Sequence, residues 1–252
     1  MRELRVLLTA VVFFTRVPVP GKLLHDGVLL EEATRYLPFV GVLVGGVSAA
    51  VMWSAALVLP TPAAVVLSML AAVLMTGAFH EDGLADTVDG FGGGWNTERK
   101  LEIMKDSRLG TYGAIALVMS MLLRYVLILA LFESGDMPKG LAVLVTSHIG
   151  ARLAPVFVMR LLSYVRLDET SKVKPIAKNL SLASFIFAVL GATLLCFGIG
   201  GFEALLRLAL VLPTAALCAW VFRTHIGGYT GDTLGASEQI SELVLLGAAL
   251  IL

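Results

Sequence analysis

Residues 62–79, PAAVVLSMLAAVLMTGAF, are an uncharged apolar run that leads directly into the polar stretch 80–90, HEDGLADTVDG. A helix needs about 17–25 mainly apolar residues to cross a bilayer. The run 62–79 meets that length. Further apolar runs with little or no charge cover residues 37–59, 109–132, 140–162, 181–200, 202–222 and 240–252. We therefore expect an all-α, polytopic integral membrane bundle with six to seven transmembrane helices.

The composition supports this class of protein. Hydrophobic residues make up 58% of the chain and charged residues 15%, whereas a typical soluble domain is about 25% charged. The segment from Leu4 to Phe14 is apolar but short, which favours a helix at the membrane interface over a cleaved signal peptide. We expect a single membrane-embedded domain over residues 1–252.

Cysteine usage and net charge narrow the function. Cys196 and Cys218 both lie in expected spans, have no metal-ligand spacing around them and say nothing about the redox compartment. The formal net charge is zero, so a nucleic-acid partner has no electrostatic support.

Lys and Arg are concentrated in alternate loops, which is the sequence signal for membrane topology. The loops near residues 59–61, 133–139 and 198–202 carry almost none. The other loops contain Arg16, Lys22, Arg35, Arg99, Lys100, Lys105, Arg108, Arg166, Lys172, Lys174, Lys178 and Arg223. By the positive-inside rule these loops face the cytoplasm. The polar motifs lie in the same loops, so we expect an active site at the cytoplasmic membrane edge.

The stretch 80–90 is expected to form a helix that carries three carboxylates on one face. Asp82, Asp86 and Asp89 are spaced i, i+4, i+7, which places them within about 60° on a helix. Such a face requires a cation, and carboxylate oxygens together with substrate phosphates are typical Mg²⁺ ligands. The alternative is three solvated loop charges. His80 lies about 160° from Asp82 and is expected to support or orient the site.

A second motif covers residues 104–113, MKDSRLGTYG. Lys105 and Arg108 are three residues apart, so on a helix they would share a face suited to binding phosphate. Asp106 offers a further carboxylate to the metal. Gly110 and Gly113 allow close approach of the backbone and favour a substrate site over a simple positive-inside anchor.

A third motif, residues 227–242, combines glycines with hydroxyl and carboxyl groups. Thr230 and Thr233 offer donors suited to phosphate or sugar, and Glu238 and Glu242 share a helical face. Glu242 begins the last apolar segment, where a carboxylate normally faces a partner or a cavity.

Three basic residues lie within expected spans. His148 and Arg152 are spaced i, i+4, and Arg124 lies in another apolar run. We expect all three to point into the bundle, either as structural partners of the acidic groups or as substrate contacts.

Four motifs in order along the chain, FFTRVPVP (13–20), HEDGLADTVDG (80–90), KDSRLG (105–110) and TGDTLGA (230–236), resemble the cobalamin synthase family of adenosylcobinamide-GDP ribazoletransferases. The resemblance spans nearly the whole chain. Glu81 is a departure, because many relatives have an apolar residue there.

The resemblance implies a Mg²⁺-dependent enzyme of the cytoplasmic membrane. It would join adenosylcobinamide-GDP to α-ribazole, or its 5′-phosphate, and release GMP. The expected metal ligands are Asp82, Asp86, Asp89 and Asp106. The expected catalytic residues are Asp82, Asp86, Lys105, Arg108 and Glu238. The expected substrate contacts are Arg16, His80, Ser107, Thr230, Gly231 and Asp232. The general base, the number of ions and the oligomeric state stay open, and a homo-oligomer is compatible with the sequence.

Two alternatives come from other kinds of membrane protein. A CDP-alcohol phosphotransferase would also carry an Asp-x-x-Asp-Gly fragment at the membrane edge, as in residues 86–90, but here glycines follow that fragment. A secondary transporter could use the acidic cluster to couple an ion. It would show inverted repeats and acids at the midplane, whereas these acids gather at one edge and no repeat is visible.

Overall fold

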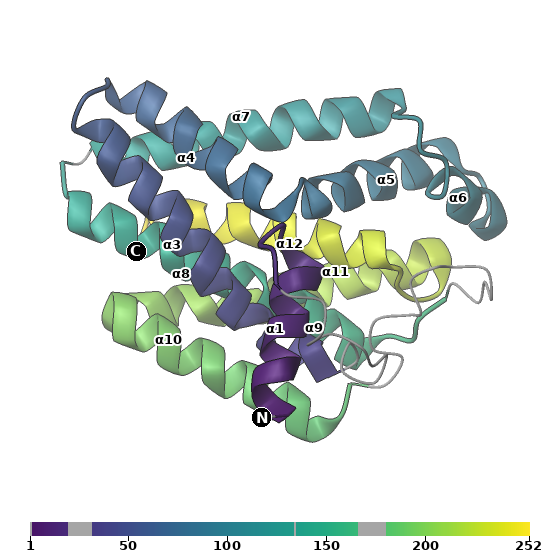
Figure 1. Ribbon diagram of the computed structural model, residues 1–252. Helices are drawn as coiled ribbons and strands as arrows, with labels where there is room; N and C mark the ends of the chain where they lie inside the picture. Colours follow the sequence, from purple (N-terminus) through teal and green to yellow (C-terminus); the bar gives the residue numbers. More distant parts are fainter. Residues whose placement is uncertain (1, 20–31, 134, 166–179) are drawn as a thin grey trace.

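The computed structural model describes residues 2–19, 32–133, 135–165 and 180–252 and shows a bundle of helices (Figure 1). Lys22, Arg166, Lys172, Lys174 and Lys178 of the topology argument, and Pro20 of the first motif, lie outside these residues. The elements are α1 (Arg2–Phe14), η2 (Thr34–Tyr36), α3 (Leu37–Ala56), α4 (Thr61–Thr76), α5 (Phe79–Gly93), α6 (Thr97–Ile103), α7 (Thr111–Glu133), α8 (Met137–Ala151), α9 (Leu153–Leu161), α10 (Leu182–Ala209), α11 (Val211–Ile226) and α12 (Gly231–Ala248). The expected all-α fold is confirmed.

Several helical segments are long and apolar enough to cross a membrane. Among the described residues there are 4: Thr34–Ala56, Thr111–Glu133, Met137–Leu161 and Leu182–Ile226. The bent pair α4 and α5 raises the number to 5. The sequence divided residues 181–222 into two spans and counted 240–252 as another. In the structure, α10 is kinked at Gly201, whose backbone is non-helical (φ 61°, ψ −152°), so the chain bends at the boundary between these two expected spans. The last apolar run belongs to α12, whose first half is polar.

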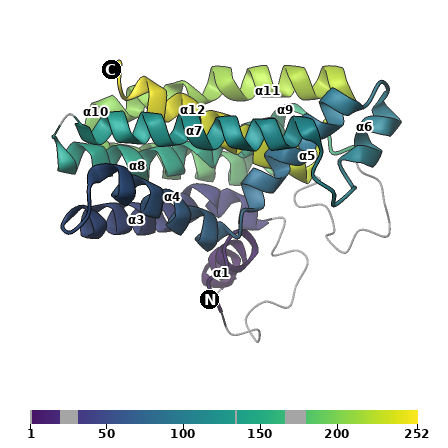
Figure 2. The ribbon, with the colours of Figure 1, turned by 90° about the horizontal axis from the view of Figure 1, so that it is seen from above.

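The bundle has two distinct ends. The turn between α3 and α4 lies at one end, and α6 lies at the other (Figure 1). Seen from above, α10 and α11 form one side, α3 and α4 the opposite side, and α7, α8 and α12 lie between them (Figure 2). Helix α12 packs against α5, α7, α8, α9 and α11. Helix α12 is therefore the central helix of the bundle.

A bend between α4 and α5 separates the apolar run from the acidic helix. The two helices meet at 85° because Gly77 and Ala78 both adopt left-handed backbone conformations. The amide of Arg16 donates to the carbonyl of Met75 at 2.7 Å, and the ring of Phe79 contacts Phe13 and Phe14. Residues at and just after the end of α1 thus pack against the bend between α4 and α5, which we call the elbow. The elbow directs α5 toward the end of the bundle that carries α6.

Candidate active site

The acidic stretch forms helix α5, as the sequence predicts, and the helix ends at Gly93 in the glycine run 92–94. The three aspartates differ in exposure along their shared face. Asp82 is exposed, Asp86 is half-buried and Asp89 is 7% exposed. The first two turns of the acidic face are therefore open, and the third is covered.

The start of α7 covers Asp89. Its two carboxylate oxygens accept hydrogen bonds from the backbone amides of Gly110 and Gly113, both at 2.8 Å. A Cβ atom at either glycine would overlap the Asp89 carboxylate, so only glycine allows this approach. Amides at the start of a helix lack intrahelical partners, and Asp89 satisfies two of them. Asp89 thus attaches the start of α7 to α5. Metal binding by Asp89 stays a prediction.

The basic motif is a loop between α6 and α7, so the expectation that Lys105 and Arg108 share a helical face is wrong. Helix α6 ends at Ile103. Met104 then packs against Gly90 of α5, and the chain turns toward Gly110. Arg108 instead grips Asp106, with Nη2 at 2.6 Å from Oδ2. The hydrogen bond from Arg108 lowers the pKa of the Asp106 carboxyl to about 2.

The cationic side chains of this loop lie at the surface. Lys105, Ser107 and Arg108 are exposed, and the Arg108 side chain is 87% exposed. Because Asp89 holds the end of the loop against α5, the loop lies beside the acidic face. The loop therefore places its cationic groups near the part of α5 that carries Asp89.

The start of α12 completes this region. A Cβ atom at Gly83 would lie 2.7 Å from the carbonyl oxygen of Asp232, and one at Gly235 would lie 3.2 Å from the carbonyl oxygen of His80. Helices α5 and α12 therefore cross in close contact. Asp232 is half-buried and Gly231 is exposed at this crossing. The structure thus brings Asp232 and Gly231 to α5, where Asp82 and Asp86 lie.

Thr230 is placed differently from its expected role. It is 0% exposed and forms a capping box with Thr233, in which each side chain accepts a hydrogen bond from the other residue's backbone amide. Its hydroxyl orders the start of α12. Arg16 is exposed, and its guanidinium lies against Gly77 at the elbow. Substrate contact by either residue stays a prediction.

Glu238, a candidate general base, lies inside the bundle. It is 0% exposed, its Oε1 is 3.0 Å from Nη1 of Arg152, and its Oε2 accepts from the amide of Gln239 at 2.9 Å. His80 is also buried, with Nδ1 3.8 Å from Glu238 Oε2. Both residues are buried, whereas Asp82 is exposed, so this geometry does not support a direct catalytic role for Glu238.

His148, Arg124 and Arg152 point into the bundle, as expected. Glu242 meets two of them, with Arg124 Nη2 at 3.0 Å and His148 Nδ1 at 3.6 Å from its Oε2. The expectation that Glu242 faces a partner is confirmed.

The sequence was next compared with known proteins. It matches the family of cobalamin-5-phosphate synthases over residues 6–250. The chain belongs to this family. Among similar proteins, the adenosylcobinamide-GDP ribazoletransferase of Shewanella amazonensis is 47% identical over 255 residues, which cover 100% of this chain and 96% of that protein. The protein of the same name from Shewanella frigidimarina is 44% identical, with 96% of this chain and 93% of that protein covered. No solved structure matches the chain.

In this member of the cobalamin-5-phosphate synthase family, the sequence reasoning missed the internal partners of the site. Glu81 is 7% exposed and pairs with Arg124 at 3.3 Å, and Gln239 accepts a hydrogen bond from Arg124 at 2.7 Å. The signals were an uncompensated Arg124 in an apolar run and a Glu81 turned about 100° from the aspartate face. Neither signal named the partner, because the two residues lie on different helices.

Proposed function

We propose that the protein transfers the adenosylcobinamide phosphate moiety from adenosylcobinamide-GDP to α-ribazole, or to α-ribazole 5′-phosphate, and releases GMP. The observation that carries this proposal is an open acidic face on α5 beside an exposed basic loop, in a chain that matches ribazoletransferases over its whole length. Opposite charges at one membrane edge suit a diphosphate substrate.

The reaction exchanges one phosphorus–oxygen bond for another. A ribazole hydroxyl oxygen bonds to the phosphorus on the corrinoid arm, and the bond from that phosphorus to the bridging oxygen breaks. GMP leaves with this oxygen, and the hydroxyl proton passes to a carboxylate. Because Glu238 is enclosed, we assign the proton acceptor to Asp232, a half-buried carboxylate at the crossing of α5 and α12.

Lys105 and Arg108 are proposed to bind the diphosphate. Lys105 provides a compact charge, and the forked guanidinium of Arg108 can bind two phosphate oxygens. To bind the diphosphate, Arg108 must release the carboxylate of Asp106. This exchange is feasible at the surface because an exposed ion pair contributes little to stability.

We also propose that the site binds Mg²⁺. Asp82 and Asp86 fit this ion because they offer hard oxygen ligands one helical turn apart on the open part of α5. Bound there, the ion would neutralise charge that builds on the leaving phosphate. Asp82 and Asp86 are more exposed than Asp89, which the start of α7 covers, so we assign Asp82 and Asp86 as the primary ligands.

We place the site on the cytoplasmic side of the cytoplasmic membrane. Arg99, Lys100, Lys105 and Arg108 lie on α6 and the loop after it, and this end carries most of the described loop cations. At the opposite end of the molecule, Lys139 is paired with Glu203 at 2.9 Å.

The direct experiment uses the full chain purified in detergent. It is incubated with Mg²⁺, adenosylcobinamide-GDP and α-ribazole, and the corrinoid product and GMP are both quantified. The two products are expected in equal amounts. A CDP-alcohol is offered in a parallel reaction. Turnover of the CDP-alcohol without corrinoid product would show that the assignment is wrong. Removal of Mg²⁺ by a chelator should stop the transfer, and readdition should restore it.

A further inference from the structure

A cluster of charged and polar side chains fills the interior of the bundle. We call it the buried charge cluster, and it consists of His80, Glu81, Arg124, His148, Arg152, Glu238, Gln239 and Glu242. These residues come from α5, α7, α8, α12 and the junction of α8 with α9. They line a cavity that leaves about 10 Å³ for the centre of a water molecule, room for roughly one water. A substrate the size of a corrinoid or a nucleotide cannot enter it.

Arg124 is the bridge of this cluster. Its guanidinium donates through Nη1 to Glu81 at 3.3 Å on α5, and through Nη2 to Gln239 at 2.7 Å and Glu242 at 3.0 Å on α12. Gln239 also donates to Glu81 at 3.3 Å. One side chain of α7 therefore ties α5 to α12 through three acceptors.

The charges of the cluster nearly cancel. Arg124 and Arg152 carry two positive charges, and Glu81, Glu238 and Glu242 carry three negative charges, which leaves one negative charge when the imidazoles are neutral. An unpaired charge in a membrane interior is costly, and the opposite charges of the cluster largely offset one another. Two adjacent guanidinium groups oppose a metal ion in the same space, although His148, Glu238 and Glu242 lie close enough together to bind one.

The bridge has a consequence for the surface of α5. Glu81 precedes Asp82 directly, and its side chain points inward to Arg124. Because successive residues on a helix differ by about 100°, fixing Glu81 inside fixes the rotation that turns Asp82 outward. The same bridge sets the position of α12 along α5, where Gly83 contacts the backbone of Asp232.

We propose that Arg124 is a positioning residue for the transfer reaction: by bridging Glu81 to Gln239 and Glu242, it sets the rotation of α5 and the register of α12, and so aims the open carboxylates at the substrate. This inference rests on the proposed function. Arg124 itself is 3% exposed and does not touch the substrate. Misplacement of a reacting group by about 1 Å can cost roughly a hundredfold in rate.

The test compares two variants of the bridge with the wild type in the full chain, after wild-type turnover has been established. Arg124→Lys keeps the charge but cannot reach three acceptors with a fixed fork. The double variant Arg124→Gln/Glu242→Gln keeps the net charge of the cluster and removes the bridge. Both are expected to lower kcat at least about tenfold with little change in KM, while the melting temperature of the double variant stays near that of the wild type.

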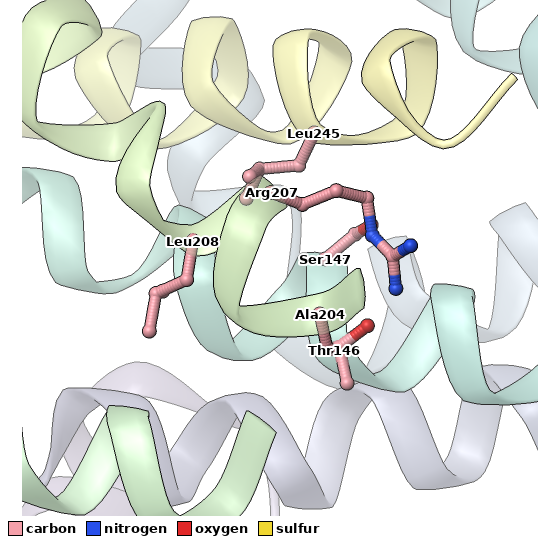
Figure 3. Close-up of a pocket in the computed structure, with 6 residues that line it drawn as sticks. All are labelled: Thr146, Ser147, Ala204, Arg207, Leu208 and Leu245. Carbon is pink, nitrogen blue, oxygen red and sulfur yellow. The ribbon is translucent and has the colours of Figure 1, made fainter. Parts of the chain in front are cut away.

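Arg207 provides the matched control. It is 3% exposed, like Arg124, but it belongs to α10 and lies beside Thr146, Ser147 and Leu245, outside the cluster (Figure 3). Arg207→Gln should lower the melting temperature and leave kcat unchanged. Wild-type kcat in either Arg124 variant, or a loss of kcat in Arg207→Gln that matches its loss of stability, would overturn the proposal.

A milder variant covers the case in which the Arg124 variants do not fold. Glu81→Gln keeps the shape of the side chain and weakens only the α5 half of the bridge. It should lower kcat in a folded protein, and an unchanged kcat would contradict the positioning role. Absence of transfer by the wild-type chain would instead reject the proposed function.

Discussion

At the scale of single residues, the aspartates of α5 divide into chemical and structural groups. Asp82→Asn should abolish transfer and leave stability unchanged, because Asp82 is exposed. Asp89→Asn should lower the free energy of unfolding by about 2 kcal/mol, since an NH₂ group would then face an amide donor of Gly110 or Gly113. Activity and thermal unfolding of the two variants in detergent test this division. Equal loss of stability in both would contradict it.

Asp106 has two candidate roles, which are to hold Arg108 and to bind the metal ion. Its lowered pKa, about 2, keeps the carboxylate ionised above pH 4, and the pair is lost only as the pH falls through about 2. A pH profile near neutrality therefore cannot reveal its role, and a substitution is needed. If Asp106 only holds Arg108, Asp106→Asn should keep kcat within about threefold, since surface ion pairs are weak. A loss of about a hundredfold, with a raised Mg²⁺ requirement, would make Asp106 a metal ligand.

At the scale of elements, the crossing of α5 and α12 depends on Gly83. Gly83→Ala would place a methyl group 2.7 Å from the Asp232 carbonyl oxygen, so the start of α12 must move. We expect a destabilisation of about 1–3 kcal/mol and a lower kcat. Gly46→Ala is the control, because a Cβ there meets nothing within 4 Å and α3 should gain up to about 1 kcal/mol. Thermal unfolding and kcat are measured for both, and a neutral Gly83→Ala would exclude the close crossing.

Local sequence patterns predicted the helices better than they predicted the contacts between helices. The spacing of Asp82, Asp86 and Asp89 correctly predicts a helix, which ends in the glycine run 92–94. The pattern could not show that the start of α7 covers only the third aspartate. It also could not predict the bend, because Ala78 has a left-handed conformation that its side chain does not signal. Periodicity reports the face of a helix, whereas tertiary packing decides what covers that face.

At the scale of the whole molecule, the orientation in the membrane can be tested with two matched substitutions. Helix α7 has 23 residues and is about 35 Å long, so it can span the hydrocarbon core. Glu98 precedes its start, Glu133 is its last residue, and both are exposed. Cys196 and Cys218 are buried, which keeps the background of thiol labelling low. A cysteine at position 98 or 133 therefore reports one side of the membrane.

The proposed cytoplasmic site predicts opposite labelling of these two positions. In intact cells, a membrane-impermeant maleimide should label Glu133→Cys and not Glu98→Cys, whereas permeabilised cells should show labelling of both. The unsubstituted chain is the control and should stay unlabelled in either case. Labelling of Glu98→Cys alone in intact cells would place the acidic face of α5 outside, where GMP-releasing chemistry would have no access to a cytoplasmic substrate. The excess of Lys and Arg on α6 and the following loop argues for the first outcome, because cationic loops are retained on the cytoplasmic side.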